Sequence, residues 1–277
     1  HLPSSCNDGV RHRNRKVRMS QSKIMTILVC YHFGTYRNFK EYYINCIRGL
    51  LRSYLPHAVS YNRFVELMPC VFYELMLFMC IYSFGRCSGI TFVDSTMIPV
   101  CHNLRRNLNK AFAGPAKSGK GTMGCCHDFK LHFICNDSGE IITFCLTAVN
   151  VDNRDDREWS VFTKHLYGKV FADRGCIKQE LFKSLFESSI HLVHGLKANM
   201  KNKLMPIWDK IMQRKRYVIE CINHLLKEKA NLVHSRHRSV HNFIMNLCSA
   251  LAAYCFFEDK PQPLPVHREN TLQLELF

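Results

Sequence analysis

Apolar residues recur at helical spacing over the first third of the chain. Between Ser20 and Gly34 they fall on one stripe, and Ser20 or Ser22 can cap the helix that this stripe predicts. A second amphipathic stretch follows, Pro56 interrupts the chain, and a long apolar stretch covers residues 61–83. The pattern predicts three helices. The first two are more typical of an ordinary helical hairpin than of a helix-turn-helix.

Beyond Gly85 the spacing changes to short runs of β-branched and aromatic residues. The sequence NDSG at 136–139 joins two such runs and predicts a β-hairpin. The later segments alternate between strand and helix, which is typical of an α/β domain with a mixed sheet and helices on its faces. The predicted strands cover residues 90–95, 129–135, 140–148, 168–173 and 191–195, and the predicted helices cover 155–166, 179–188, 206–229 and 239–257.

The composition is that of a folded and basic protein. Lys+Arg number 38 against 22 Asp+Glu, a net charge of +16, and the hydrophobic fraction of 47% excludes a disordered chain. This charge favours polyanionic partners, with nucleic acid or an anionic membrane surface as the first candidates. Residues 11–18 hold six basic side chains, histidine included, and form either an arm that contacts DNA or a solvated leader.

Neither the cysteines nor the longest apolar stretch predicts a special site. The 15 cysteines never form the paired C-x-x-C ligands of a zinc site, and we expect reduced thiols. Residues 67–84 are nearly all apolar, but Pro69 and Glu74 interrupt the roughly 20 apolar residues that a membrane span needs. We therefore expect a buried helix of a helical domain, and no membrane.

Residues 114–122, GPAKSGKGT, share the glycine and lysine spacing of a phosphate-binding P-loop. A P-loop needs a hydroxyl residue after the lysine to bind magnesium, and Gly121 stands there instead. It also needs an apolar strand before its first glycine, whereas the preceding stretch is polar and basic. We therefore expect a flexible basic loop near phosphates of another kind, and a P-loop ATPase is a distant alternative.

Three acidic residues lie on separate predicted elements. Asp94 lies in the run ITFVDS, Asp173 ends the run GKVFAD, and Glu220 lies in the long helix near the C-terminal end. Carboxylates are ligands that Mg²⁺ prefers, and two such ions about 3.5–4 Å apart can activate an attacking oxygen at a phosphodiester. Taken singly, each acid is equally well explained as a turn residue or a surface residue.

The helix around Glu220 separates charged from apolar residues. At about 100° per residue, Glu220, Asn223 and Lys227 fall within about 40° of Arg216. This predicts one packed side and one side that presents a carboxylate between cations, although any amphipathic helix is similarly two-sided. The apolar residues expected on the packed side are Val218, Cys221, Ile222 and Leu225.

These blocks together resemble the DDE transposases of bacterial insertion sequences, which are relatives of retroviral integrases with an RNase H-like fold. The matching segments are VDST at 93–96, FADRG at 171–175, and the spacing R-x-x-x-E-x-x-x-x-x-x-K from Arg216 through Glu220 to Lys227. The similarity extends over roughly residues 10–258. It implies an α/β fold, an RNase H-like mixed sheet with flanking helices, preceded by a small all-helical N-terminal domain.

The resemblance also implies a role for each matched residue. Asp94, Asp173 and Glu220 would bind two Mg²⁺ ions, for which Mn²⁺ could substitute, and Arg216 and Lys227 would contact DNA phosphate beside the cleaved bond. The reaction would be hydrolysis at the end of the element, followed by attack of the freed 3′-OH on target DNA. The partners would be terminal inverted repeats and target DNA, bound by a homo-oligomer at the nucleoid in the bacterial cytoplasm.

Basic residues are distributed as this interpretation requires. Residues 195–240 hold eleven Lys/Arg against three acids, and residues 101–130 hold six against one. Such patches neutralise phosphates and bind DNA without regard to its sequence. We therefore expect further DNA contacts from Asn223, Arg105, Arg106, Lys117, Lys120 and Lys130. His132 could orient an acid, although a packed or surface histidine is the commoner case.

We expect a helical, DNA-contacting domain over residues 1–88, a DDE catalytic domain over 89–258 and a flexible tail over 259–277. Two alternatives to a transposase stay open: an inactive remnant that only binds DNA, and a general RNase H-like nuclease without strand transfer. Gln213 stands where these transposases often have a tyrosine, three residues before Arg216. The residues around Asp173 depart from the family pattern as well, and both departures keep the remnant under consideration.

Overall fold

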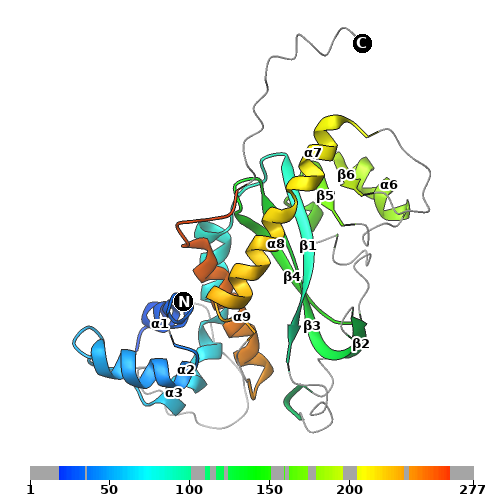
Figure 1. The fold of residues 1–277 in the computed structure, drawn as a ribbon. Coiled ribbons are helices and arrows are strands. Elements are labelled where there is room, and N and C mark those ends of the chain that lie inside the picture. The colour runs from blue at the N-terminus through cyan, green and yellow to red at the C-terminus, as the bar shows by residue number, and fades with distance from the viewer. Residues whose placement is uncertain are drawn as a thin grey trace, which may run out of the picture.

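Helices form the N-terminal part of the protein (Figure 1). The computed structural model describes residues 19–34, 36–100, 110–112, 117–121, 124–150, 159, 162–173, 179–195, 205–233 and 237–262. The predicted first helix is confirmed as α1 (Gln21–Tyr31), with its apolar stripe buried and the Ser20 hydroxyl accepting a hydrogen bond from the Lys23 amide. The elements that follow are α2 (Phe39–Glu41), η1 (Tyr42–Leu50), α3 (Tyr61–Leu67), η2 (Met68–Val71), α4 (Phe72–Phe78) and η3 (Met79–Ser83).

The segments α3, η2, α4 and η3 follow one another as the long predicted helix, Tyr61–Ser83. This helix is long and apolar enough to cross a membrane, and 33% of its most apolar window is buried inside the protein. Leu75 and Met79 are fully buried, whereas Tyr73 and Leu77 on the other side are exposed. The expectation of a buried helix is therefore correct for one side only, and the expected absence of a membrane stays a prediction.

One mixed sheet of six strands follows, in the order β2-β3-β1-β5-β6 with β4 paired to β3. The pairs that β3 makes with β1, β2 and β4 are antiparallel, and β5 pairs in parallel with β1 and β6. An antiparallel half and a parallel half that meet at β1 form the RNase H-like fold expected from the sequence. The strands are β1 (Ile90–Pro99), β2 (Lys117–Gly121), β3 (Gly124–Asn136), β4 (Ile141–Ala148), β5 (Gly168–Ala172) and β6 (Ile190–His194).

The predicted hairpin is confirmed at β3 and β4, but β2 corrects a prediction. The segment expected to be a flexible basic loop includes a strand that pairs with β3 from Lys117↔Asp128 to Gly121↔Gly124. Pairing with β3 gives residues 117–121 their extended conformation, and this pairing cannot be predicted from their glycine-rich composition. Among the described residues, β2 is followed by β3 and not by the helix whose N-terminus a P-loop needs. Half of the predicted helix over 155–166 lies outside the described residues, and Trp159, Phe162 and Thr163 within it are helical.

Helices cover both faces of the sheet. In Figure 1 the path through α7 and α8 crosses β1, and α9 lies between this path and the N-terminal helices. The single long helix predicted over 206–229 is confirmed as a continuous path with a break at Arg216. The elements are η5 (Lys110–Phe112), α6 (Gln179–Glu187), α7 (Ile207–Lys215), α8 (Tyr217–His224), η7 (Leu225–Lys229) and α9 (Val240–Cys255).

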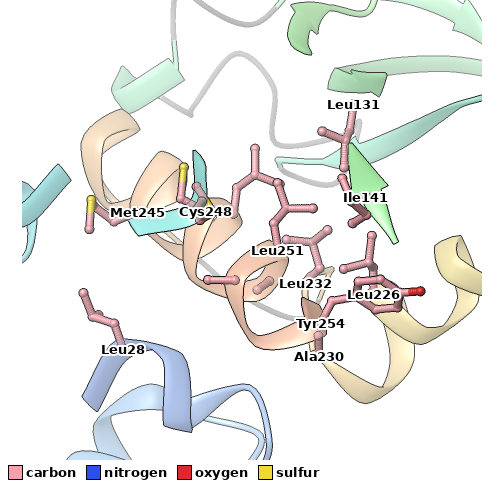
Figure 2. Packing of buried hydrophobic residues seen from close by; sticks show 14 of the residues in the cluster. Leu28, Leu131, Ile141, Leu226, Ala230, Leu232, Met245, Cys248, Leu251 and Tyr254 are labelled. Atoms are coloured by element: carbon pink, nitrogen blue, oxygen red, sulfur yellow. The ribbon is translucent and has the colours of Figure 1, made fainter. Parts of the chain in front are cut away.

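The larger of two buried clusters joins the helical part to the sheet (Figure 2). Leu28 of α1, Leu251 of α9, Leu226 of η7 and Ile141 of β4 all belong to it. The hydroxyl of Tyr254 on α9 also donates, at 2.6 Å, to the carbonyl oxygen of Gly139 in the turn between β3 and β4. The helical part and the sheet thus share one core, and the domain boundary at residue 88 remains a prediction.

The second cluster lies on the opposite face of the sheet. Trp159 and Phe162 pack there with Leu185 of α6 and with strand residues such as Val93. Phe92 belongs to the first cluster although it is adjacent to Val93 in β1. Such alternation is typical of a strand that is covered on both faces. The side chains of β1 that lie on the same face as Phe92 turn toward α8.

Candidate active site

The register of β1 against β5 brings two of the predicted acids together. The strands run parallel, and Phe92↔Phe171 is the last pair of their ladder. Asp94 and Asp173 each follow this pair by two residues, and Asp173 comes directly after β5. Side chains alternate with a period of two, so both carboxylates lie on the face that Phe92 and Phe171 share, on strands about 4.8 Å apart.

The helical path through α7 and α8 brings the third acid to this face. Nη2 of Arg216, the residue between the two helices, lies 3.0 Å from Oε1 of Glu220, and Nη1 lies 3.5 Å from Oδ1 of Asp94. Nδ2 of Asn223 donates to Oδ2 of Asp94 at 3.1 Å. One guanidinium therefore bridges a carboxylate of the sheet and a carboxylate of the helix.

The charges at this place act on one another. The pKa of Asp94 is raised, chiefly because the carboxyl is buried; the positive charge of Arg216 lowers the pKa, and the negative charges of Asp173 and Glu220 raise it. Burial lowers the pKa of Lys227, while the negative charge of Asp94 raises it. Three acids and two cations thus form one electrostatic group around Asp94.

Along α8 and η7, the charged stripe consists of Arg216, Glu220, Asn223 and Lys227. It lies beside the packed side of the helix, not opposite to it as the sequence suggested. Cys221, predicted on the packed side, is exposed, and Leu225 is only half-buried. Going round the helix, the stripe lies between a buried side and an exposed side that carries Tyr217 and His224. This border position lets Arg216 reach the sheet. The fully buried residues are Val218, Ile219, Ile222 and Leu226.

The donor set suits a hard divalent cation, although the three carboxylates do not close around one point. Within the described ranges, no three His, Cys, Asp or Glu side chains form a group that could hold a metal ion. Arg216 instead supplies the positive charge between Asp94 and Glu220. Asp173 and Glu220 are exposed, and carboxylate oxygens are the ligands that Mg²⁺ prefers. The chemistry of the three carboxylates suits a divalent ion, but binding one would require the Arg216 side chain to turn away from Asp94 and the carboxylates to move closer together.

The remaining predicted DNA contacts are less well placed by the structure. Arg105 and Arg106 lie outside the described residues. Lys117 and Lys120 belong to β2, of which the structure describes the backbone pairing. Lys130 is half-buried in β3, an odd number of residues from the partner of Asp94, and therefore lies on the other face of the sheet.

His132 is a packed histidine on the face of the sheet opposite to Asp94, which is the alternative to its orienting an acid. Phe133 is the partner of Asp94 across β1 and β3, so the neighbouring His132 side chain points to the opposite face. There Nε2 of His132 lies 2.9 Å from the Thr147 hydroxyl. Burial lowers the pKa of this histidine to about 4, with a further lowering from Lys130.

Two contacts between α7 and β5 were not predicted from the sequence. Nε2 of Gln213 donates to the carbonyl oxygen of Ala172 at 2.9 Å. Nζ of Lys169 donates to Oδ1 of Asp209 at 2.6 Å. Two signals in the sequence concern Gln213: it precedes Arg216 by three residues, about one helical turn, and it stands where the resembled transposases often have a tyrosine.

Comparison with known families agrees with this geometry. Residues 84–240 match the family model described as a transposase DDE domain. The matched segment is more than half of the chain and contains Asp94, Asp173 and Glu220. The curated proteins offer no match. On the strength of the family match and the RNase H-like sheet, the chain belongs to the DDE transposases.

Proposed function

We propose that this protein cleaves DNA strands at the ends of a mobile element in the presence of Mg²⁺ and joins the freed ends to target DNA. The observation that carries the proposal is that Arg216 pairs with both Asp94 and Glu220, while the charge of Asp173 also acts on Asp94, beside one face of an RNase H-like sheet. Acids on separate elements that act on one another's charge are suited to holding divalent ions.

The three carboxylates would hold two Mg²⁺ ions, and Mn²⁺ could substitute. Bound metal would supply Lewis-acid stabilisation of the phosphodiester and of the attacking and leaving oxygens. Asn223 would keep the Asp94 carboxylate turned toward the site through its 3.1 Å hydrogen bond. Arg216, released from Asp94, and Lys227 would bind the phosphate oxygens beside the cleaved bond.

Basic side chains outside the acids would hold the DNA duplex. The net charge of +16 supports phosphate binding that is independent of sequence and weakens with salt. In this proposal residues 1–88 contact DNA, and a homo-oligomer holds paired element ends at the nucleoid of a bacterial cytoplasm. The further contacts would come from Asn223, Arg105, Arg106, Lys117 and Lys120, and Lys130 would contribute from the opposite face of the sheet.

The test is a strand-cleavage and strand-transfer assay on labelled inverted-repeat DNA with Mg²⁺, comparing the wild-type protein with Asp94→Asn. We expect Asp94→Asn to bind DNA but not to cleave it. Asp259→Asn is the matched control, because Asp259 is exposed and lies near the end of the described chain. Equal cleavage by the wild type and Asp94→Asn would contradict the proposal.

The same assay separates the alternatives. DNA binding without cleavage in the wild-type protein would favour an inactive remnant. Cleavage without joining to target DNA would favour a general nuclease of the same fold.

A further inference from the structure

We propose that Gln213 is a positioning residue, which sets the Asp173 carboxylate relative to Glu220 by tying α7 to the end of β5. This inference rests on the proposed metal-dependent function. It assigns a role to a residue that does not itself touch the acids.

The contact lies at the peptide bond that leads into Asp173. Ala172 is the last residue of β5, its side chain is fully buried, and its carbonyl oxygen accepts the 2.9 Å hydrogen bond from Gln213. Asp173, the next residue, is exposed and outside the strand. A planar peptide group joins the two residues, so a hydrogen bond to the Ala172 carbonyl restricts the direction in which the chain enters Asp173.

The same helical path is fixed against both strands that bear acids. Lys169 and Asp209 form a second tie between β5 and α7, and Asn223 ties α8 to β1 at Asp94. Glu220 lies on this path between Gln213 and Asn223. The amide side chains of Gln213 and Asn223 therefore fix the position of Glu220 relative to the two acids on the strands.

Gln213 makes this contact through its N–H group alone. Its Oε1 is a buried atom for which the described part of the chain provides no hydrogen-bond partner. A buried acceptor without a partner destabilises the fold, so the donated hydrogen bond is the favourable interaction of this amide. Removing the donor while keeping the length of the side chain thus isolates the proposed role.

The experiment measures Mn²⁺ affinity by electron paramagnetic resonance for the wild type and Gln213→Met. Methionine matches glutamine in length but has no donor. We expect the Mn²⁺ dissociation constant to rise about tenfold or more, because contacts that orient metal ligands are worth 10–100-fold in affinity.

Gln21→Met is the matched control for a lost glutamine hydrogen bond. It removes the 2.6 Å bond from Gln21 to Glu74 in the helical part, and we expect it to leave Mn²⁺ affinity unchanged. Wild-type affinity in Gln213→Met, or equal weakening in Gln21→Met, would overturn the positioning role. A wild-type protein that binds Mn²⁺ no better than Asp173→Asn would contradict the proposed function itself, and this inference with it.

Discussion

Arg216 neutralises two carboxylates that would otherwise repel each other. Its side chain is 15% exposed, and it lies within ion-pair distance of Asp94 and Glu220 at once. A divalent ion bound by these acids would supply the same positive charge. The guanidinium and the metal are therefore expected to compete for Asp94.

Arg216→Met should make the stability of the protein more dependent on metal. Without the guanidinium, the half-buried Asp94 loses a partner, which costs about 1–3 kcal/mol of unfolding free energy in the absence of metal. Added Mn²⁺ should then raise the melting temperature of the variant more than that of the wild type. Arg214→Met, which removes an exposed charge from the same helix, is the control. An equal rise in all three proteins would contradict this competition.

Buried histidines give a second prediction at the scale of single residues. His32 is buried with Nδ1 2.5 Å from the Ala230 carbonyl oxygen, and burial lowers its pKa from 6.5 to about 4. The unfolded chain therefore takes up the proton more readily. The free energy of unfolding should therefore be highest, with respect to this group, above pH 6.5. It should decrease as the pH drops toward 4, by at most about 1.4 kcal/mol per pH unit for each such group.

Urea unfolding at several pH values checks this expectation. His32→Asn, which retains a donor for the carbonyl but does not titrate, should show a smaller loss of stability between pH 6.5 and 4 than the wild type does. His57→Gln changes an exposed histidine and should leave the pH dependence as it is. An unchanged pH dependence in His32→Asn would show that this imidazole contributes nothing to it.

The sequence was sufficient to predict which residues form the candidate site, but not which contacts those residues make in the fold. The acids and the stripe of Arg216, Glu220 and Asn223 follow from helical periodicity and from a family resemblance, both of which are properties of local sequence. The partner of Gln213 lies across the fold on β5, so nothing near it in the sequence indicates the contact. Whether His132 faces the acids or packs on the other face could not be predicted, because that depends on the register of its strand with the neighbouring strand.

Among the elements, α7 and β5 are joined by an ion pair with unequal partners. The side chain of Asp209 is 4% exposed, while that of Lys169 is 35% exposed. Removing the lysine leaves a buried carboxylate without its cation. Removing the aspartate leaves a lysine that can turn into water.

We therefore expect Lys169→Met to lower the free energy of unfolding by about 3 kcal/mol and Asp209→Asn to lower it by only about 1 kcal/mol. Urea denaturation measures both. Arg63→Met, which breaks an exposed pair with Glu66, should cost less than about 1 kcal/mol. Equal losses in the two variants at the buried pair, or the reverse order, would contradict the asymmetry.

Elements with a strong apolar pattern were predictable, and those that depend on a distant partner were not. The long helix through Glu220 and the hairpin at 136–139 were both correct in type and place. β2 was missed because its glycines disfavour a strand and only pairing with β3 makes one. The break at Arg216 was likewise invisible in the periodicity.

For the whole molecule, the shared core has a consequence for unfolding. Leu251 of α9 is fully buried between the helical part and the sheet (Figure 2). Leu251→Ala should lower the free energy of unfolding by about 2–5 kcal/mol, and hydrogen exchange should accelerate in α1 and β1 together. Leu77→Ala, at a 61% exposed position, should change little. Faster exchange confined to the helical part would show that the two parts unfold separately.

In the proposed function, Asp94, Asp173 and Glu220 act together in one metal-dependent site between the sheet and the α7–α8 path. The most direct measurement is the initial rate of Mg²⁺-dependent DNA strand cleavage by Asp173→Asn. Asp173 is exposed, so its replacement leaves the fold intact. We predict a rate at least about a hundredfold below that of the wild type, with unchanged DNA binding. Cleavage by Asp173→Asn at the wild-type rate would show that Asp173 takes no part in the reaction.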